Sequence, residues 1–453
     1  MGFSTVYIKT LGCKVNSFDS DVIEHQFRTK GYRMVSSVAD ADVTIINTCS
    51  VTRAAEKEAR YLLRRYSKEN PATYKVVTGC YAQVDQDALK QIQEIDLIVP
   101  NQKKEQIVSL IESKGDASKL QDENSSIDNE EHSSFHKRGL LQFQSSSILF
   151  DATSRKKTRA FVKIQDGCNG FCAYCQIPYA RGSSRSVPPN KVISHIDDLI
   201  HQGTLEIVLT GIDIGDYGKD LTEEAVSLAS LLEKIFSLEG LKRIRLSSIE
   251  PGDMTDDLLE VIKENKHFFC DHFHLPLQSG SDAILKRMGR SYSCEQYFEV
   301  VCKIKECFPD AMISADIIPG FPSEKEEEFQ ETIAFIKKCG ISMLHVFPYS
   351  KRPNTRALRM PEHVEPLIVK ERARMLRDLS KRLLLDFIKK QIGTEASVLW
   401  EAKKDSQQRY FGKTRNYMDV VLADSNNKLI QGTETRVVLK GLIGSTKVLG
   451  IGI

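Results

Sequence analysis

The sequence has little that would place the protein in a membrane or outside the cell. None of its 453 residues lies in an uninterrupted apolar run of the roughly 20 residues needed to cross a bilayer. Its first residues, MGFSTVYIKT, also lack the basic segment followed by an apolar segment that marks a secretory signal. We therefore expect a cytoplasmic protein with no membrane partner.

Net charge and tryptophan are also scarce, with a formal charge of +2 and one Trp, whereas 41% of the residues are hydrophobic. This composition is that of a globular protein, and the net charge by itself indicates no nucleic-acid partner. The charge is unevenly distributed, however. Residues 350–390 contain twelve Lys and Arg against five Asp and Glu, and residues 391–453 contain nine against six, so these stretches carry +10. They predict a basic C-terminal face, although a solvated helix over 369–390 explains part of the pattern.

Disulfides do not persist in the cytoplasm, so the eleven cysteines indicate metal ligands or buried thiols. Three of them, Cys168, Cys172 and Cys175, stand in the stretch DGCNGFCAYC, separated by three residues and then by two. Their thiolates can converge on an iron–sulfur cluster, in which three cysteines leave one of four irons with an open coordination position. A zinc site needs a fourth ligand close by, and the next histidine is His195. A structural zinc knuckle is therefore the weaker alternative.

A second group of three cysteines follows the first predicted strands. Strand character at 5–11, 43–47, 74–78 and 96–99 alternates with helical segments such as 19–31 and 53–69, which indicates a parallel sheet with helices on its faces. The carboxyl ends of parallel strands meet at one edge of a sheet. We interpret the cysteines there as a second three-thiolate site, with buried structural thiols as the alternative. They are Cys13, Cys49 and Cys80, and nearby Asn16 and Asn47 are candidates for hydrogen bonds to sulfides.

After a polar segment at 113–155, which we interpret as a linker, strands and helices alternate again in residues 156–390. Six strands predict a partial (β/α) barrel, in which the chemistry lies on the loops after the strands. We expect these strands at 161–164, 206–210, 243–247, 272–276, 312–317 and 343–347. Candidates for cofactor binding on those loops are Tyr174, otherwise a packed aromatic, and Thr210, Asp213, Ser247, Gln278 and Asp316.

The last stretch, 391–453, changes to short alternating apolar runs separated by Gly and Asn, which predicts a small antiparallel β-barrel. Its basic residues Lys413, Arg415, Arg436 and Lys440 suit contact with a phosphate backbone. An ordinary β-module with scattered lysines explains the same pattern. The predicted fold class is therefore α/β, with domains at 1–112, 156–390 and 391–453.

The stretch 166–175 resembles the signature of the radical S-adenosylmethionine enzymes, which has three cysteines at this spacing and an aromatic residue before the last. In that family the open iron chelates S-adenosylmethionine, and reductive cleavage gives a 5′-deoxyadenosyl radical. The order of the domains resembles the methylthiotransferases over nearly the full chain. This resemblance implies two 4Fe-4S clusters, an auxiliary one on Cys13, Cys49 and Cys80 and one on the central cysteines. It also implies an RNA-binding TRAM module at the C-terminus.

Four stretches look like the branch that acts on N6-threonylcarbamoyladenosine of tRNA. The isopentenyladenosine branch usually has Gln-Met-Asn after the first cysteine and the ribosomal-protein branch Pro-Lys-Asn, where this chain has Lys14-Val15-Asn16. The resemblance implies methylthiolation of C2 of this nucleoside at tRNA position 37, next to the anticodon. The four stretches are LGCKVNSFDSD, QDGCNGFCAYCQIPYARGSSRS, HLPLQSGSDAILKRMGRSYS and HVFPYSKRPNTRA.

The partners expected from this resemblance are tRNA, an electron donor such as flavodoxin, and a sulfur donor. For RNA binding we expect Arg181 and Arg185 near the barrel mouth, Lys351 and Arg352 after the barrel, and the basic residues of the terminal module. No side chain is assigned a catalytic role beyond the cluster ligands. A methylthiotransferase acting on an aspartate of a ribosomal protein and a non-catalytic RNA-binding metalloprotein remain as alternatives.

The two separate groups of three thiolates predict the metal content of the protein. Anaerobically reconstituted protein is expected to hold about eight iron ions, because each four-iron cluster needs its own three cysteines. Replacing all three cysteines of either group by alanine is expected to lower the content to about four. Iron analysis and absorption spectroscopy measure this, and stoichiometric zinc without charge-transfer absorbance would contradict the prediction.

Overall fold

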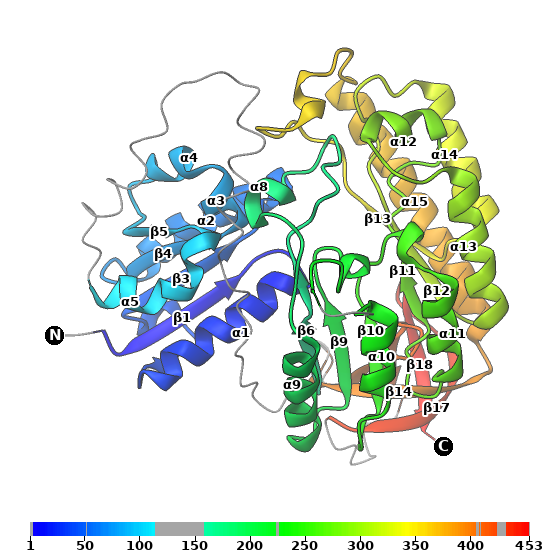
Figure 1. Cartoon of the computed structure of the whole chain (residues 1–453), viewed down its shortest axis with the longest axis horizontal. Coiled ribbons are helices and arrows are strands. Elements are labelled where there is room, and N and C mark those ends of the chain that lie inside the picture. The colour runs from blue at the N-terminus through cyan, green and yellow to red at the C-terminus, as the bar shows by residue number, and fades with distance from the viewer. Residues whose placement is uncertain are drawn as a thin grey trace. The chain divides into compact units, whose positions relative to one another are not determined.

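The computed structural model describes residues 3–50, 52–113, 158–222, 226–404, 407, 409–423 and 432–452 (Figure 1). These residues form two compact units. The first comprises the described residues up to 113 together with Gln165–Phe171 and Cys175–Val187. The second comprises residues 158–164, Cys172–Tyr174 and the described residues from Pro188 onward. The predicted linker, 113–155, lies outside the described residues except for Ser113.

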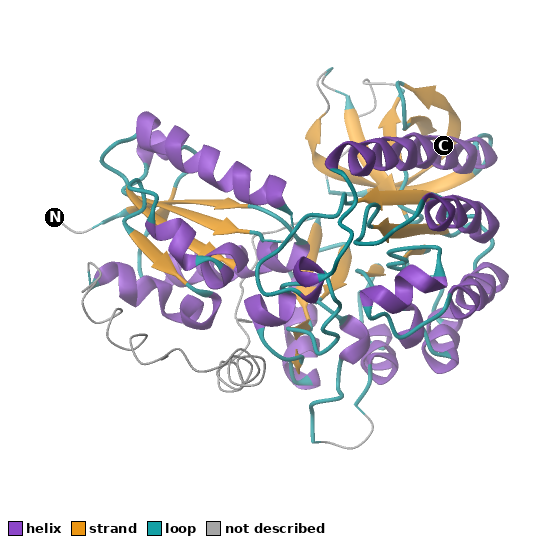
Figure 2. Cartoon of the chain, turned by 90° about the horizontal axis from the view of Figure 1, so that it is seen from above, coloured by secondary structure: helices purple, strands orange, loops and turns teal. Residues whose placement is uncertain are grey.

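The first unit is a parallel five-stranded sheet with helices on both faces (Figure 2). One face packs against α1 (Lys14–Thr29) and α5 (Ile107–Glu112), and the other against α2 (Arg53–Glu69). This confirms the predicted architecture, to which the structure adds an edge strand of only two residues. In spatial order the strands are β2 (Arg33–Met34), β1 (Thr5–Thr10), β3 (Val43–Thr48), β4 (Tyr74–Gly79) and β5 (Leu97–Val99). Two short helices, α3 (Cys80–Val84) and α4 (Gln86–Lys90), follow β4 in the sequence.

Helix α1 begins earlier than the sequence indicated. The acidic Asp19 was expected to start the helix, but it lies in the second turn and is buried. The residue before the helix is Cys13, whose extended backbone, with φ −89° and ψ 174°, ends the loop after β1. The helix therefore starts directly after the first cysteine of the sheet edge.

In the second unit, six parallel strands follow one another in chain order (Figure 1). Parallel bridges from Ile244 to Phe269 and from Ser248 to His274 join its two three-stranded sheets. The partial (β/α) barrel is thereby confirmed. The strands are β6 (Arg159–Lys163), β9 (Glu206–Thr210), β10 (Arg243–Leu246), β11 (His272–His274), β12 (Met312–Ile317) and β13 (Met343–Val346). The helices are α9 (Pro189–His201), α10 (Leu228–Phe236), α11 (Asp256–Glu264), α12 (Asp282–Met288), α13 (Cys294–Cys307), α14 (Glu326–Cys339) and α15 (Pro366–Gln391).

The C-terminal residues of the second unit form a closed five-stranded barrel, as predicted. All its strand pairs are antiparallel except β16 with β18, which is parallel. The single tryptophan, Trp400, is fully buried in its core, and Met312 of β12 and Ile388 of α15 belong to the same apolar cluster. This module therefore shares a core with the (β/α) barrel. Its strands are β14 (Glu395–Lys404), β15 (Tyr410–Thr414), β16 (Asp419–Leu422), β17 (Glu434–Ile443) and β18 (Lys447–Gly452).

Buried ion pairs also join the terminal module to the base of the (β/α) barrel. Glu206, the first residue of β9, is fully buried and lies 2.9 Å from Arg245 Nε and 3.6 Å from Arg243 Nη1. Arg243 Nη2 donates to Glu434 of β17 at 2.7 Å, and Arg245 Nη1 donates to the backbone oxygen of Arg415 at 3.0 Å. Two buried arginines thus use partners from both parts, and neither part satisfies them alone.

Replacing Glu206 by Gln is expected to lower the free energy of unfolding by about 3–5 kcal/mol, because the buried guanidinium groups lose their carboxylate. Burial alone would raise the pKa of Glu206, but Arg245, Arg159 and Arg243 outweigh it and lower the pKa to about 2 from its ordinary 4.5. A lowered pKa stabilises the folded state above pH 4.5, and this stabilisation is lost as pH falls toward 2.

Denaturant unfolding between pH 2 and 7 measures both effects, and the variant is expected to lack the part of the acid dependence that Glu206 supplies. The control is Glu401→Gln. Glu401 is also a partner of Arg159, and the side chain of Glu401 is 28% exposed. Such a partly exposed pair is worth about 0–1 kcal/mol. Equal stability of the two variants would contradict the prediction.

Candidate cluster and nucleic-acid sites

The first group of cysteines lies at the carboxyl edge of the sheet in the first unit. Cys13 follows β1, Cys49 follows β3, and Cys80 follows β4. Strands β1 and β3 are neighbours where the strand order reverses, which is where open α/β sheets bind ligands. Gly12 has a φ of +96°, and a Cβ atom there would lie 2.5 Å from Cβ and 2.8 Å from Sγ of Cys49. Glycine is therefore required for Cys49 to approach the backbone beside Cys13.

Buried polar atoms without partners flank this edge. Asn47 Oδ1, Ser50 Oγ and Thr78 Oγ1 have no hydrogen-bond partner among the described residues. Each stands within two positions of Cys49 or Cys80 in the sequence. An unsatisfied buried polar group costs about 1–3 kcal/mol, and hydroxyl donors match the sulfide acceptors of an iron–sulfur cluster. The two hydroxyls, of Ser50 and Thr78, therefore fit a bound cluster, whereas Asn47 Oδ1 can only accept hydrogen bonds.

Asn16 and Asn47 do not offer the N–H groups to sulfides that the sequence suggested. Asn16 Nδ2 donates to the backbone oxygens of Leu11 and Thr48, both at 2.9 Å. Asn47 Nδ2 donates to the backbone oxygen of Asn16 and to Ser20 Oγ, both at 2.9 Å. The two amides instead hold the ends of β1 and β3 together, and this part of the prediction was wrong.

The second group of cysteines lies in the loop at 168–175, and each of its sulfurs accepts an N–H hydrogen bond. Such bonds stabilise thiolate charge, and hydrogen bonds to the sulfurs also tune the reduction potential of a cluster. These residues too fit a cluster. The donors are Gly170 N to Cys168 at 3.2 Å and Ile177 N to Cys175 at 3.4 Å in the first unit, and Arg290 Nη1 to Cys172 at 3.1 Å in the second.

A short framework in the first unit shapes this loop. Strand β7 (Gln165–Asp166) pairs antiparallel with β8 (Arg185–Ser186), and α8 (Ile177–Arg181) lies between them in sequence. Gly167 has a φ of +77°, and a Cβ atom there would lie 2.0 Å from the backbone oxygen of Ser183. Any larger residue at this position would separate the two sides of the loop.

None of the eleven cysteines forms a disulfide bond. Within the described residues, no three His, Cys, Asp or Glu side chains form a site for a single metal ion. The cysteines of a four-iron cluster each bind a different iron. Cys13 is exposed and the cysteines at 168, 172 and 175 are partly exposed, whereas Cys49 and Cys80 are buried.

The predicted cofactor residues of the second unit stand at or after the ends of its strands. Thr210 ends β9, and Ser247 follows β10 with an Oγ that has no partner among the described residues. Gln278 follows β11 with a φ of +65°, and its backbone N donates to the backbone oxygen of Asp316 at 2.8 Å. Asp316 Oδ1 lies 3.1 Å from His274 Nε2. These four positions present polar groups at one edge of the barrel.

The other two candidates lie in loops. Asp213 is the N-cap residue of the 3-10 helix Ile214–Asp216, after β9. Tyr174 is partly buried and packs against the apolar cluster that includes Met288 and Phe321. The packed-aromatic interpretation of Tyr174 therefore has support from its contacts.

Arg290 is a site residue that the sequence did not single out. It stands after α12 rather than after a strand, so its position carries no strand-end signal. Its guanidinium donates to both Cys172 Sγ and Glu250, which follows β10. Burial raises the pKa of Glu250 to about 7, although Arg290 opposes that shift.

Several basic residues predicted to contact RNA are engaged within the protein. The side chain of Arg181 is only 3% exposed, and Arg352 is 4% exposed. Arg185 Nη2 donates to the backbone oxygen of Arg181 at 2.9 Å. Lys413 lies 2.5 Å from Asp419, and Arg415 Nη1 donates to a backbone oxygen at 2.6 Å. Because these side chains are buried or bonded within the protein, they are poorly placed to contact phosphate groups.

Other basic residues lie at the surface. Lys351 and Lys440 are exposed, and the side chain of Arg436 is 79% exposed. Helix α15 adds exposed cations at intervals of four, three and four residues, which places them on one helical face. These are Lys370, Arg374, Arg377 and Lys381, of which Arg374 is paired with the exposed Glu371 and with Asp378.

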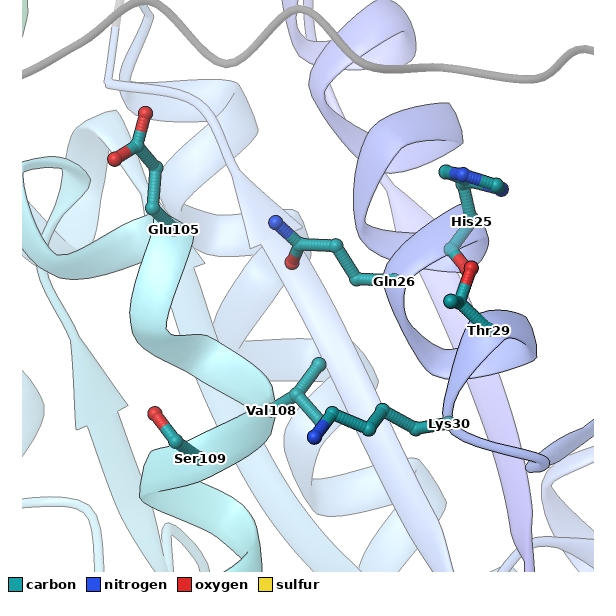
Figure 3. A pocket seen from close by; sticks show the side chains of 7 residues that line it. All are labelled: His25, Gln26, Thr29, Lys30, Glu105, Val108 and Ser109. Atoms are coloured by element: carbon teal, nitrogen blue, oxygen red, sulfur yellow. The ribbon is translucent and has the colours of Figure 1, made fainter.

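A groove in the first unit carries none of these candidates (Figure 3). It lies between the C-terminal half of α1 and helix α5, at the other end of α1 from Cys13. We assign it no function. Its lining residues are His25, Gln26, Thr29, Lys30, Glu105, Val108 and Ser109.

Two family models match the chain. Residues 5–100 match the Uncharacterized protein family UPF0004, and residues 162–336 match the Radical SAM superfamily. The Threonylcarbamoyladenosine tRNA methylthiotransferase MtaB of Bacillus subtilis is 37% identical over 99% of this chain and 94% of that protein. The chain belongs to the radical S-adenosylmethionine methylthiotransferases. Membership of the radical S-adenosylmethionine family implies S-adenosylmethionine and one 4Fe-4S cluster as cofactors.

Other relatives carry two different names. The MtaB of Aquifex aeolicus is 38% identical over 92% of this chain and 96% of that protein. The tRNA-2-methylthio-N(6)-dimethylallyladenosine synthase of Syntrophobacter fumaroxidans is 34% identical over 90% of this chain and 88% of that protein. Both share the family with this chain, but their names differ in the nucleoside.

Solved structures show the same fold at low sequence identity. The radical S-adenosylmethionine methyltransferase TsrM of Kitasatospora setae matches with a TM-score of 0.55 and 13% identity, over 78% of this chain and 75% of that one.

Among the described helices of the present chain, none combines the length and apolar character needed to cross a bilayer.

Proposed function

We propose that the protein methylthiolates C2 of N6-threonylcarbamoyladenosine at position 37 of tRNA. The observation that carries this proposal is the near full-length similarity to proteins named for that reaction. The sequence Lys14-Val15-Asn16 after the first cysteine also differs from the Gln-Met-Asn usual in the isopentenyladenosine branch. The reaction replaces a C–H bond by a C–S bond to a methylthio group.

The proposal assigns a role to each group of cysteines. Cys168, Cys172 and Cys175 hold the cluster that binds S-adenosylmethionine, and the cysteines at the sheet edge hold a second 4Fe-4S cluster. The bound cofactors supply radical chemistry at an unactivated C–H bond, which no side chain can supply. The methyl group comes from S-adenosylmethionine, the sulfur from a donor, and the electrons from a carrier such as flavodoxin.

The chain's own residues bind and orient these groups. Ser50 and Thr78 offer buried hydroxyl donors to the second cluster, because neither oxygen has a partner among the described residues. Arg290 donates to Cys172 and stabilises charge on that thiolate. We infer that polar groups at the strand ends, together with two loop residues, bind S-adenosylmethionine. The candidates at the strand ends are Thr210, Ser247, Gln278 and Asp316, and the loop residues are Tyr174 and Asp213.

Nucleoside mass analysis of tRNA from cells with and without the protein tests the proposal. The 2-methylthio form of threonylcarbamoyladenosine is expected only with the protein. In reconstituted enzyme, Cys172→Ala is expected to abolish deoxyadenosine formation, whereas Cys49→Ala retains cleavage but gives no methylthio product. Cys302→Ala, outside both groups, is the control. A methylthio mass on a ribosomal protein, or on isopentenyladenosine, with threonylcarbamoyladenosine unchanged, would contradict the proposal.

We further infer that the exposed cations, rather than those that are buried or bonded within the protein, contact the tRNA backbone. Arg436, Lys440 and Lys351 are exposed, as is the basic face of α15. Deleting residues 391–453 is a poor test, because it would strip Arg243 and Arg245 of their buried partners. Point substitutions at exposed positions leave that contact intact.

The double variant Arg436→Ala/Lys440→Ala is expected to weaken tRNA binding and to lower the slope of log K against log salt by about 1.4 to 1.8. Each lost phosphate contact to single-stranded or duplex RNA removes about 0.7 to 0.9 from that slope. Binding titrations at several salt concentrations measure it. The matched control is Lys57→Ala/Lys90→Ala, two exposed lysines of the first unit. The same slope in both variants would argue against the terminal module as the contact.

A further inference from the structure

A buried network of four charged side chains lies inside the first unit. Arg181 Nη1 donates to both carboxylate oxygens of Asp166, at 2.9 and 3.0 Å. Arg181 Nη2 donates to Asp19 Oδ2 at 3.1 Å, and Lys104 Nζ donates to the same oxygen at 3.0 Å. The side chains of Arg181, Asp19 and Lys104 are 2–3% exposed. Two cations and two carboxylates thus balance one another away from water.

The members of this network stand next to the cysteines of both candidate sites. Three of its residues each lie within six sequence positions of one of these cysteines. The residues in between belong to the elements that shape the sites. The pairs are Asp166 with Cys168, Arg181 with Cys175, and Asp19 with Cys13. The network therefore connects the loop of the central motif with the helix that begins at the sheet edge.

Arg181 also acts on the sheet edge through Asn16. Arg181 Nη2 donates to Asn16 Oδ1 at 2.6 Å. The amide nitrogen of Asn16 in turn holds the backbone oxygens of Leu11 and Thr48, which precede the cysteines at 13 and 49. One guanidinium thereby fixes the orientation of an amide that ties two cysteine-bearing loops together.

The third cysteine of the sheet edge is reached from another segment. Asn101 begins the 3-10 helix Asn101–Gln106, which contains Lys104. Asn101 Nδ2 lies 3.7 Å from Cys80 Sγ and donates to the backbone oxygen of Ala180 at 2.8 Å. Because Ala180 is the residue before Arg181, the same two segments that form the ion network also meet beside Cys80.

The energetics of this network point to positioning rather than to stability alone. A buried ion pair often stabilises a fold no more than well-packed apolar residues do, because desolvation of the charges offsets their attraction. Burial would by itself lower the pKa of Arg181, but the negative charges of Asp166, Asp19 and the thiolate forms of Cys80 and Cys13 raise it well above its ordinary value. Arg181 Nε is also buried and has no partner among the described residues. One N–H of this side chain is left for a further acceptor.

We propose that Arg181 is a positioning residue that fixes the Cys13, Cys49 and Cys80 site to the segments of the central motif that belong to the first unit. The proposal rests on the proposed function, which places a second cluster there. It also replaces the expectation that Arg181 contacts RNA.

The test uses full-length protein in which Cys168, Cys172 and Cys175 are alanine, so that the remaining iron reports the sheet-edge site. In this background Arg181→Met is expected to release iron to a chelator about tenfold faster or more, since loss of a supporting residue costs about 10- to 100-fold in metal affinity. Arg181→Lys, which keeps the charge, is expected to restore part of the retention. An unchanged release rate in Arg181→Met would overturn the proposal.

Two controls separate positioning from loss of folding. Arg372→Met removes another buried arginine, paired with Glu324 at 2.7 Å in the second unit, and is expected to leave the release rate unchanged. The double variant Arg181→Met/Asp166→Asn removes a buried cation and a buried anion together, and is expected to keep wild-type helix content by circular dichroism yet still release iron rapidly. Retention of iron at the wild-type rate in this variant would overturn the proposal.

Further outcomes distinguish a failure of the positioning role of Arg181 from a failure of the proposed second cluster. If the triple-alanine parent itself binds no iron, the second cluster and the role of Arg181 both fail. If the parent holds about four irons regardless of Arg181, only the positioning role fails. If Arg181→Met retains iron but loses tRNA affinity and salt dependence, Arg181 is an RNA contact after all, and the proposal is overturned.

Discussion

The common direction of parallel strands is the constraint on which both units depend. In a parallel sheet all carboxyl ends lie at one edge, so residues far apart in sequence meet there without any direct link between them. The first unit places Cys13, Cys49 and Cys80 at such an edge. The second unit does the same with Ser247 and Asp316. The sites are therefore properties of topology first and of individual side chains second.

This constraint explains what the sequence could predict. The positions of the strands can be predicted because buried parallel strands are short apolar runs in the sequence. A cysteine that follows such a run can then be assigned to the carboxyl end of that strand. The six strands of the barrel and the cysteine-bearing edge of the first sheet were therefore accessible from the sequence alone. The two-residue strand β2 was not, since two residues establish no pattern.

The sequence did not show which charged side chains are buried or paired within the protein. Arg181 and Lys413 look like ordinary surface cations in a list of residues, and only the structure shows their carboxylate partners. Those partners stand 15 and 6 positions away in sequence, but Arg181 also binds Asp19, 162 positions away, and no local pattern reveals a pairing at that distance. Arg352 and Arg372 are buried as well, so a count of charges in the last quarter of the chain overstated its surface charge.

The shared core and ion pairs of the terminal module have a consequence for synthesis on the ribosome. Arg243 is made 191 residues before its partner Glu434. At about 5–20 residues per second, roughly 10 to 40 seconds pass before that partner exists. Until then Arg243 and Arg245 have Glu206 but lack their partners in the terminal module, and Met312, once made, lacks the rest of its apolar cluster. Translation that stops before the last strands therefore leaves the base of the (β/α) barrel without part of its apolar core and without two of its buried hydrogen-bond partners.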